Sequence, residues 1–382
     1  MKQQIILLSV IAGLFTACGV SHQTEKQYKD PRESDESMKQ AYKLQEKVKF
    51  RVQADAETQA VLATTEEDAA DDPAMWIHPE DPSKSLIVGT HKKKGLYVYD
   101  LAGNELGFYP VGKVNNVDIR QGVVLGQDTL DIVAASNRND NSITLMKMTA
   151  EGKLVDVSAQ PIMTGEAIDD IYGFCMYQDQ STGNSFVIAN GKNGVVQQWA
   201  LAAADSGKVT ASLAKSYKVP SQPEGMVADD ATGTLYIGEE AQGIWKVDLS
   251  VDTVATPELI ASTKVADNEM LEADLEGIAL YKTGIETGYL LASSQGNFSY
   301  AVFSLENNYE YLGSFAIEKG KVDGVEETDG IEVITDSLSE QYPKGMLMVQ
   351  DGFNFDDDSL KAQNFKMIDW RKIEQLLVKK EM

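Results

Sequence analysis

The chain has 382 residues, and its apolar fraction of 43% is large enough to bury a substantial core and to exclude disorder throughout. Its 34 basic and 59 acidic residues give a net charge of −25, which argues against nucleic acid as a partner because an acidic surface repels phosphate backbones. Two cysteines and three histidines exclude a disulfide scaffold and a cysteine-rich zinc site, whereas the many carboxylates favour calcium or magnesium as a metal.

The N-terminus carries the features of an export signal. Lys2 precedes an apolar run over residues 5–17, which is too short to span a bilayer and is typical of the core of a signal peptide. The run ends in LFTACG, which resembles a bacterial lipobox, so we predict a signal peptide over residues 1–17 and a lipid anchor on Cys18. Gly19 favours the outer membrane, and a periplasmic or secreted protein is the alternative.

A polar segment over residues 18–46 shows little apolar periodicity and is predicted to be a tether, followed by one domain over residues 47–382. Six segments of this domain look alike. Each has an apolar run, a turn with Gly or Asn and a second, alternating run, which is typical of a β-hairpin. The six hairpins begin at residues 86, 131, 185, 234, 289 and 345.

Another short strand with polar first residues precedes each hairpin. A unit of three or four strands that recurs about every 50 residues is typical of a propeller blade. One blade cannot bury its own faces, so the ring of blades must close. We therefore predict an all-β fold, a single six-bladed β-propeller with little helix. The tail over residues 371–380 is predicted either to be helical or to extend the last strand.

The first residues of the innermost strands occupy equivalent positions, which lie in a ring around the channel of a propeller. The six residues are Asp72, Asn116, Tyr172, Glu224, Glu276 and Asp329, and four of them are carboxylates. Facing carboxylates repel one another, and a divalent cation removes this conflict. Calcium suits ligands from separate blades because it accepts six to eight oxygens in loose geometry.

The hairpin turns form a second ring in which charge is segregated. Blades one to three place basic residues there, namely Lys92, Lys93, Arg138 and Lys192. Blades four to six place acidic or neutral ones, namely Glu239, Glu240, Gln295 and Asp351. A single charged turn is usually a solvated loop, but three successive blades with a cation in one register favour an anion held between basic residues and metal ions. Phosphate fits both kinds of partner.

The order and spacing of several motifs resemble the β-propeller phytases, calcium-dependent enzymes that remove phosphate from inositol hexakisphosphate (phytate). The resemblance runs from about residue 50 to residue 372. It is carried by motifs such as DDPAMW (71–76), THKKKGL (90–96), NNVDIR (115–120), EGM (224–226), DLEG (274–277) and LLASSQGN (290–297). The resemblance implies a six-bladed propeller with its site on the top face and several calcium ions.

The resemblance also implies the roles of individual residues. The metal ligands would be Asp71, Asp72, Glu224, Glu240, Asp274, Glu276, Asp323 and Asp329. The phosphate-binding residues would be Lys92, Lys93, Arg138, Tyr172 and Lys192. In the expected reaction, a water activated by calcium attacks phosphorus in line. Asp72, Glu224 and Glu276 hold the metal–water core, while Lys92, Arg138 and Lys192 stabilise the charge on the phosphate oxygens.

The expected activity is therefore that of a 3-phytase-type phosphomonoesterase. A calcium-dependent propeller lactonase is one alternative, and it would need a metal at the channel but no basic half of the rim. A surface module that binds calcium and phosphate without turnover is the other alternative, because a fold does not fix a function. A monomer is expected, since a propeller closes on itself.

Overall fold

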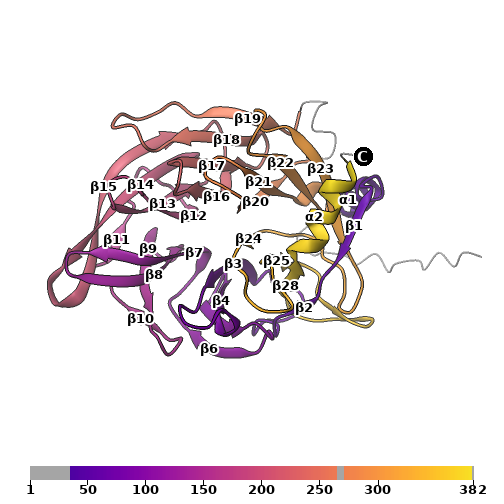
Figure 1. Ribbon diagram of the computed structural model, residues 1–382, viewed down its shortest axis with the longest axis horizontal. Coiled ribbons are helices and arrows are strands. Elements are labelled where there is room, and N and C mark those ends of the chain that lie inside the picture. The colour runs from indigo at the N-terminus through magenta and orange to yellow at the C-terminus, as the bar shows by residue number, and fades with distance from the viewer. Residues whose placement is uncertain (1–34, 265–270, 381–382) are drawn as a thin grey trace, which may run out of the picture.

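The computed structural model describes residues 35–264 and 271–380, and within them the chain is built mainly from β-strands. The sheets stand around a central axis, and the chain passes once around the ring, as the change from indigo to yellow in Figure 1 shows. This arrangement confirms the predicted six-bladed propeller. Residues 1–34, with the predicted signal peptide and Cys18, lie outside the described residues.

In each blade, consecutive strands pair antiparallel from the channel outward. Blade one consists of β3 (Ala70–Trp76), β4 (Leu86–His91), β5 (Gly95–Asp100) and β6 (Glu105–Tyr109). Blade two consists of β7 (Val114–Leu125), β8 (Asp128–Asn137), β9 (Ser142–Met148) and β10 (Leu154–Asp156), with β11 (Ile162–Met163) also paired to β9. Blade three consists of β12 (Ile171–Gln178), β13 (Ser185–Gly191), β14 (Val195–Ala204) and β15 (Lys208–Lys218).

The remaining blades follow the same plan. Blade four consists of β16 (Pro223–Asp229), β17 (Thr234–Glu239), β18 (Gly243–Asp248) and β19 (Glu258–Ser262). Blade five consists of β20 (Leu275–Lys282), β21 (Gly288–Ser294), β22 (Ser299–Ser304) and β23 (Tyr311–Glu318). Blade six contains β24 (Ile331–Ile334), β25 (Met346–Asp351) and β28 (Asn364–Asp369), and a small hairpin of β26 (Phe355–Asp356) and β27 (Ser359–Leu360) lies between its last two strands.

The start of the chain closes the ring. Strand β2 (Ala56–Glu57) pairs antiparallel with β28 and becomes the outermost strand of blade six. Strand β1 (Phe50–Gln53) pairs parallel with β23 and adds a fifth strand to blade five. Segments about 300 residues apart in the sequence are therefore held together by main-chain hydrogen bonds, which ties the ends of the domain to each other.

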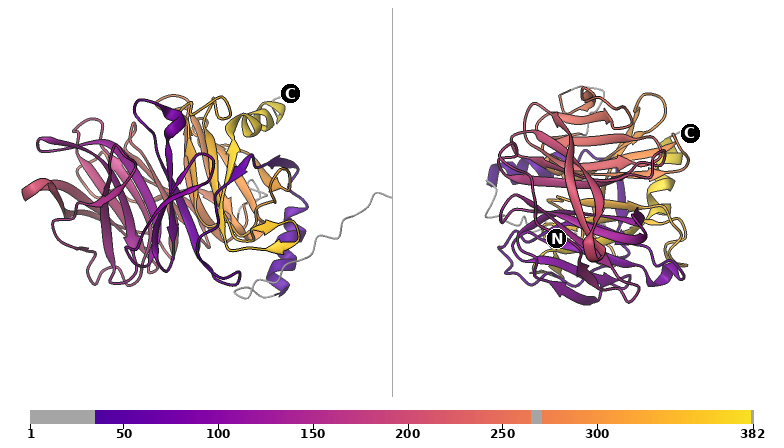
Figure 2. Two further views of the ribbon diagram at one scale, coloured as in Figure 1. Left: turned by 90° about the horizontal axis from the view of Figure 1, so that it is seen from below. Right: turned by 90° about the vertical axis from the view of Figure 1, so that its left-hand side faces the viewer.

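Two α-helices flank the ring. Helix α2 (Trp370–Lys380) shows that the C-terminal tail is helical rather than an extension of the last strand. Helix α1 (Asp35–Gln45) falls within the segment expected to be a tether, and its Met38 and Ala41 are buried against Phe298 and Phe353 of the propeller. In the left view of Figure 2, α1 and α2 lie towards opposite faces of the disc. No helix among the described residues is long and apolar enough to cross a membrane.

The core lies between neighbouring blades, where their flat faces pack against each other. Blades one and two share a cluster that includes Val88, Val98, Val117 and Val133, each 3% exposed or less. Because strands such as β3, β4 and β25 are buried on both faces, they are apolar at most positions rather than strictly alternating. The polar exceptions lie at the ends of these strands and include Asp71.

Candidate active site

A β-bulge at the start of each of the first five innermost strands turns side chains out of the sheet. The register of the inner strand pair shifts around Asp71–Asp72, Asn115–Asn116, Tyr172–Gly173, Glu224–Gly225 and Glu276–Gly277. A bulge re-aims side chains that a regular strand would place on its two faces. The residues that the repeat aligned by sequence therefore share one local geometry, and each bulge places two residues, not one, at the ring.

Polar residues of the second strand hold these bulges. In five blades, the next-to-last residue of the second strand bonds to the backbone of its own or the neighbouring blade at the ring: Thr90, Ser136, Asn190, Ser293 and Gln350. Asn190, for example, accepts a hydrogen bond from the Gly173 amide at 2.9 Å and donates one to the Glu224 carbonyl at 2.9 Å. Sequence reasoning missed this set, although its shared register is visible in the repeat.

Glycines let neighbouring blades approach closely at the ring. A Cβ on Gly173 would lie 1.8 Å from the Glu224 carbonyl oxygen, and one on Gly225 would lie 2.3 Å from the Glu276 carbonyl oxygen. The motifs Tyr-Gly and Glu-Gly thus combine a functional side chain with a residue that has no Cβ to clash. Backbone bonds, such as Gly277 N–H to the Asp329 carbonyl at 2.8 Å, fix the same contact.

Three carboxylates meet on this frame. Oxygens of Glu224, Glu240 and Glu276 all lie within 4.8 Å of one another, and Glu224 and Glu276 are 3% and 5% exposed. Burial raises the pKa of Glu276 well above its usual value, and the nearby Glu224 carboxylate raises it further. Burial and Glu224 likewise raise the pKa of the half-buried Glu240 to about 7. Partial burial raises the pKa of Asp274, and the Glu224 carboxylate raises it further.

Asp71 is the most isolated acid of the ring. It is completely buried, and neither of its carboxylate oxygens has a hydrogen-bond partner. Burial raises its pKa, Lys92 opposes the rise, and Glu224, Asp329 and Asp72 add to it. Asp72 is better supported, because its Oδ2 accepts a hydrogen bond from the Val117 amide at 3.0 Å. A buried carboxylate without a partner is costly, so this position calls for a cation.

Lys92 lies on the acidic side of the site rather than with the other basic residues. Its ammonium group contacts Asp329 at 2.7 Å and Asp68 at 2.9 Å. Gln295 donates to the other oxygen of Asp329 at 2.8 Å. Burial raises the pKa of Asp329 to about 6, with Lys92 opposing the rise. Asp68 was not among the expected site residues, and nothing in the repeat aligned it with them.

Two other basic residues, Arg138 and Lys192, gather around Tyr172. The Lys192 ammonium lies 4.3 Å and the Arg138 guanidinium carbon 5.5 Å from the centre of the tyrosine ring, on which both form cation–π contacts. Arg138 also contacts Asp170 at 3.3 Å. Burial raises the pKa of the Tyr172 hydroxyl, and the carboxylates of Glu224 and Glu276 raise it further, so the acidic cluster lies beside this ring.

Some charged residues of the expected set have other partners. Asp323 pairs with Lys366, a fully buried lysine that also contacts Glu57 and, at 3.2 Å, Asp351. The structure therefore places Asp323 in a second, lysine-centred cluster, separate from Glu224 and Glu276. Lys93 is about half exposed and pairs with Glu67 at 3.3 Å on the rim.

Glu239 is part of the acidic half of the rim in sequence but not in contact with the cluster. It is fully buried, accepts hydrogen bonds from Ser221, and accepts one from the Trp245 indole at 2.6 Å. Its carboxylate is thus satisfied by neutral donors within blade four. Of the two consecutive glutamates at this turn, only Glu240 contributes an oxygen to the three-carboxylate cluster.

Comparison with known proteins decides the family. The family model described as Phytase matches residues 32–381. The chain is also 39% identical over 343 residues to the 3-phytase of Bacillus subtilis (strain 168), an alignment that covers 88% of each protein. The chain belongs to the phytase family. The resemblance seen in the sequence motifs is thereby confirmed, and the three clustered glutamates have the spacing needed to hold a metal ion.

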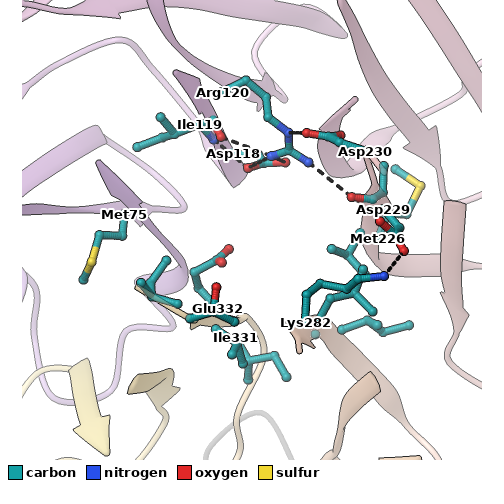
Figure 3. Close-up of a pocket in the computed structure, with 18 of the residues that line it drawn as sticks. Met75, Asp118, Ile119, Arg120, Met226, Asp229, Asp230, Lys282, Ile331 and Glu332 are labelled. Atoms are coloured by element: carbon teal, nitrogen blue, oxygen red, sulfur yellow. Dashed lines mark hydrogen bonds and ion pairs between the residues drawn. The ribbon is translucent and has the colours of Figure 1, made fainter. Parts of the chain in front are cut away.

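Below the ring of this phytase-family propeller, a cavity of about 660 Å³ extends along the innermost strands (Figure 3). Arg120 bridges Asp118 and Asp230 at 2.8 Å each, and Lys282 pairs with Asp229. Glu332 also lines the cavity, and burial raises its pKa to about 8. Acidic residues outnumber basic ones here, so a phosphate group fits the basic residues at the ring better than this cavity.

Proposed function

We propose that the protein is a calcium-dependent phosphomonoesterase that hydrolyses phytate at the top of the propeller. One observation carries the proposal: the backbone of Glu224, a member of the carboxylate cluster, lies against Gly173, whose neighbour Tyr172 is flanked by Lys192 and Arg138. Such a site offers ligands for a hard cation on one side and for a phosphate group on the other. The name of the B. subtilis relative, 3-phytase, supports phytate as the substrate.

The residues present fit calcium. Both oxygens of Asp71 and the Oε2 of Glu276 are buried without a hydrogen-bond partner, and the three clustered glutamates supply further oxygens from separate blades. All of these donors are hard oxygens, which favours calcium over metals that prefer nitrogen or sulfur. When bound, calcium would neutralise these carboxylates and activate a water for attack on phosphorus. Asp72, Asp274 and Asp329 extend the donor set.

The basic residues would bind and orient the reacting phosphate. Lys192 and Arg138 approach the Tyr172 ring within 6 Å, so one phosphate group can contact both. Their positive charges would stabilise the negative charge on the phosphate oxygens in the transition state. Because the pKa of Tyr172 is raised, its hydroxyl stays protonated and can donate a hydrogen bond to the same group. Phytate carries several phosphates, and the exposed Lys93 suits a neighbouring one.

Phosphate release tests this function. Purified protein is incubated with phytate and calcium, and a matched sample receives EDTA. We expect release that calcium supports and EDTA abolishes, with the first product identified by chromatography to test for attack at the 3-phosphate. Binding of phytate without release would assign a binding module instead. Hydrolysis of lactones without phosphate release would assign a lactonase, although that reaction gives the basic residues no role.

We further propose that the protein is exported and lipid-anchored through Cys18 in the outer membrane. The sequence LFTACG after an apolar run supports this assignment. Metabolic labelling with a radioactive fatty acid should mark the wild-type protein and not the Cys18→Ser variant. Fractionation of the envelope would identify the membrane, and an unlabelled wild-type protein in the medium would contradict the anchor.

We also propose that the protein is a monomer. Sedimentation of the protein should give the mass of a monomer.

A further inference from the structure

Asn115 links the two halves of the site. It lies on the bulge of β7 and is completely buried. Its Nδ2 donates one hydrogen bond to Oε1 of Glu224 at 2.7 Å and another to Oδ1 of Asn116 at 3.1 Å. Its Oδ1 accepts a longer hydrogen bond from the Arg138 guanidinium at 3.5 Å. One side-chain amide therefore touches a carboxylate of the acidic cluster and a cation of the basic group.

The amide of Asn115 satisfies both neighbours at this position. A carboxylate has no hydrogen to donate to Glu224, and an apolar side chain would leave the buried Asn115 partners without hydrogen bonds. The orientation of the amide follows from its neighbours, since the NH₂ group must face the carboxylate and the oxygen must face the guanidinium. Asn116 extends the connection towards Asp72, because burial raises the pKa of that carboxyl and the Asn116 side chain opposes the rise.

We propose that Asn115 is a positioning residue that fixes the Glu224 carboxylate for metal binding and couples it to Arg138 at the phosphate. The inference rests on the proposed calcium-dependent function and extends it to a residue that contacts neither the metal nor the substrate. A carboxylate has two oxygens and about four lone-pair sites, so one hydrogen bond from Asn115 leaves Glu224 free to bind a cation. If Arg138 moves towards a phosphate, its hydrogen bond to the Asn115 amide changes. The hydrogen bond from the same amide to Glu224 then shifts the position of that carboxylate.

Two variants separate the two contacts. Asn115→Ala removes both, and we expect the calcium dissociation constant, measured by calorimetry without phytate, to rise roughly tenfold or more because a hydrogen bond to a charged group is lost. The KM for phytate should rise as well. Asn115→Asp is nearly isosteric, keeps the oxygen that faces Arg138 and loses the donor to Glu224. In that variant, kcat should fall about tenfold or more while KM stays within about twofold of the wild-type value.

Two further variants serve as controls. Gln198 is a buried amide in the middle of blade three, where it accepts a hydrogen bond from the Tyr217 hydroxyl at 3.1 Å. Gln198→Leu should lower the stability but leave calcium affinity, KM and kcat unchanged. Arg138→Ala should raise KM, and it should change calcium affinity less than Asn115→Ala does, because the hydrogen bond from Asn115 to Glu224 stays in place. In the Asn115→Ala/Arg138→Ala double variant, the increase in KM should be smaller than the product of the two single increases.

The outcomes are decisive in either direction. Wild-type calcium affinity and KM in Asn115→Ala would overturn the inference, as would fully multiplicative KM effects in the double variant. Equal kinetic losses in Asn115→Asp and Gln198→Leu would also overturn it, because they would show general destabilisation. The calorimetric measurement needs no turnover. If the wild-type protein binds calcium but releases no phosphate, the proposed function fails while the effect of Asn115 on calcium affinity is still measured.

Discussion

Replacing Glu224 with glutamine separates the stability of the protein from its activity. Glu224 is nearly fully buried and raises the pKa values of Asp71, Glu276 and Glu240. The oxygens of the three glutamates lie within 4.8 Å of one another, and two charges at that upper limit repel by about 3.5 kcal/mol at an effective dielectric constant of about 20. Part of this repulsion is already relieved by protonation, so we expect Glu224→Gln to stabilise the calcium-free protein by about 1–3 kcal/mol.

For a chain of this length, 1 kcal/mol corresponds to about 1.4 °C, so the thermal midpoint in EDTA should rise by about 1–4 °C. Saturating calcium should stabilise the variant less than the wild type, because one ligand charge is missing. Phosphate release from phytate should fall at least about a hundredfold. The matched variant Glu240→Gln, at a half-buried position, should show the same changes at a smaller size. A lower midpoint in EDTA, or wild-type activity of Glu224→Gln at saturating calcium, would refute the reasoning.

Three other predictions concern the backbone, the charge state and the phosphate contacts. Gly225→Ala places a Cβ 2.3 Å from the Glu276 carbonyl oxygen, so the free energy of unfolding should fall by about 2 kcal/mol or more and the activity should fall with it. In the control Gly107→Ala, the nearest atom to the new Cβ is 3.4 Å away, so denaturation and phosphate release should both match the wild type. The raised pKa values of Asp329 (about 6) and Glu240 (about 7) mean that the calcium-free native state holds extra protons. Denaturation in EDTA should therefore show that stability falls as pH rises from about 4 to 7. Calcium titration should show that affinity rises from about pH 6 to 7, because the ligands lose their protons. The opposite slopes would contradict the raised pKa values. Lys192→Ala should raise KM for phytate and lower kcat, and unchanged phosphate release would contradict its contact with the substrate.

The repeat in the sequence was sufficient to predict the blades and the ring. Its period placed Glu224 and Glu276 at equivalent positions, and both lie on equivalent bulges in the structure. The alignment could pick only one residue per blade, because nothing in the sequence shows that a bulge brings two neighbours to the ring. Asn116 was therefore noted, while Asn115, which contacts Glu224 directly, was missed.

Partners that are distant in sequence could not be predicted. Lys92 was grouped with the basic residues by its register, yet it contacts Asp329, 237 positions away. Asp323 was grouped with the metal ligands by resemblance, yet the buried Lys366 is its ion-pair partner. Helix α1 was missed because its few apolar residues are explained only by Phe298 and Phe353 on the propeller surface. In each case, the sequence states the charge or polarity of a residue but not which side chain the fold places against it.

The architecture of the ring explains why closely spaced carboxylates can serve as a cation site here. Flexible carboxylates would relieve their repulsion by moving apart. At this ring they cannot, because the backbones behind them are locked by close glycine contacts and by hydrogen bonds such as that from Asn190 to the Glu224 carbonyl. The repulsion is therefore retained in the calcium-free protein as raised pKa values and is released when a cation binds. Loosening the frame at Gly225 and removing the charge at Glu224 should consequently both weaken calcium binding, but with opposite effects on the stability of the calcium-free fold.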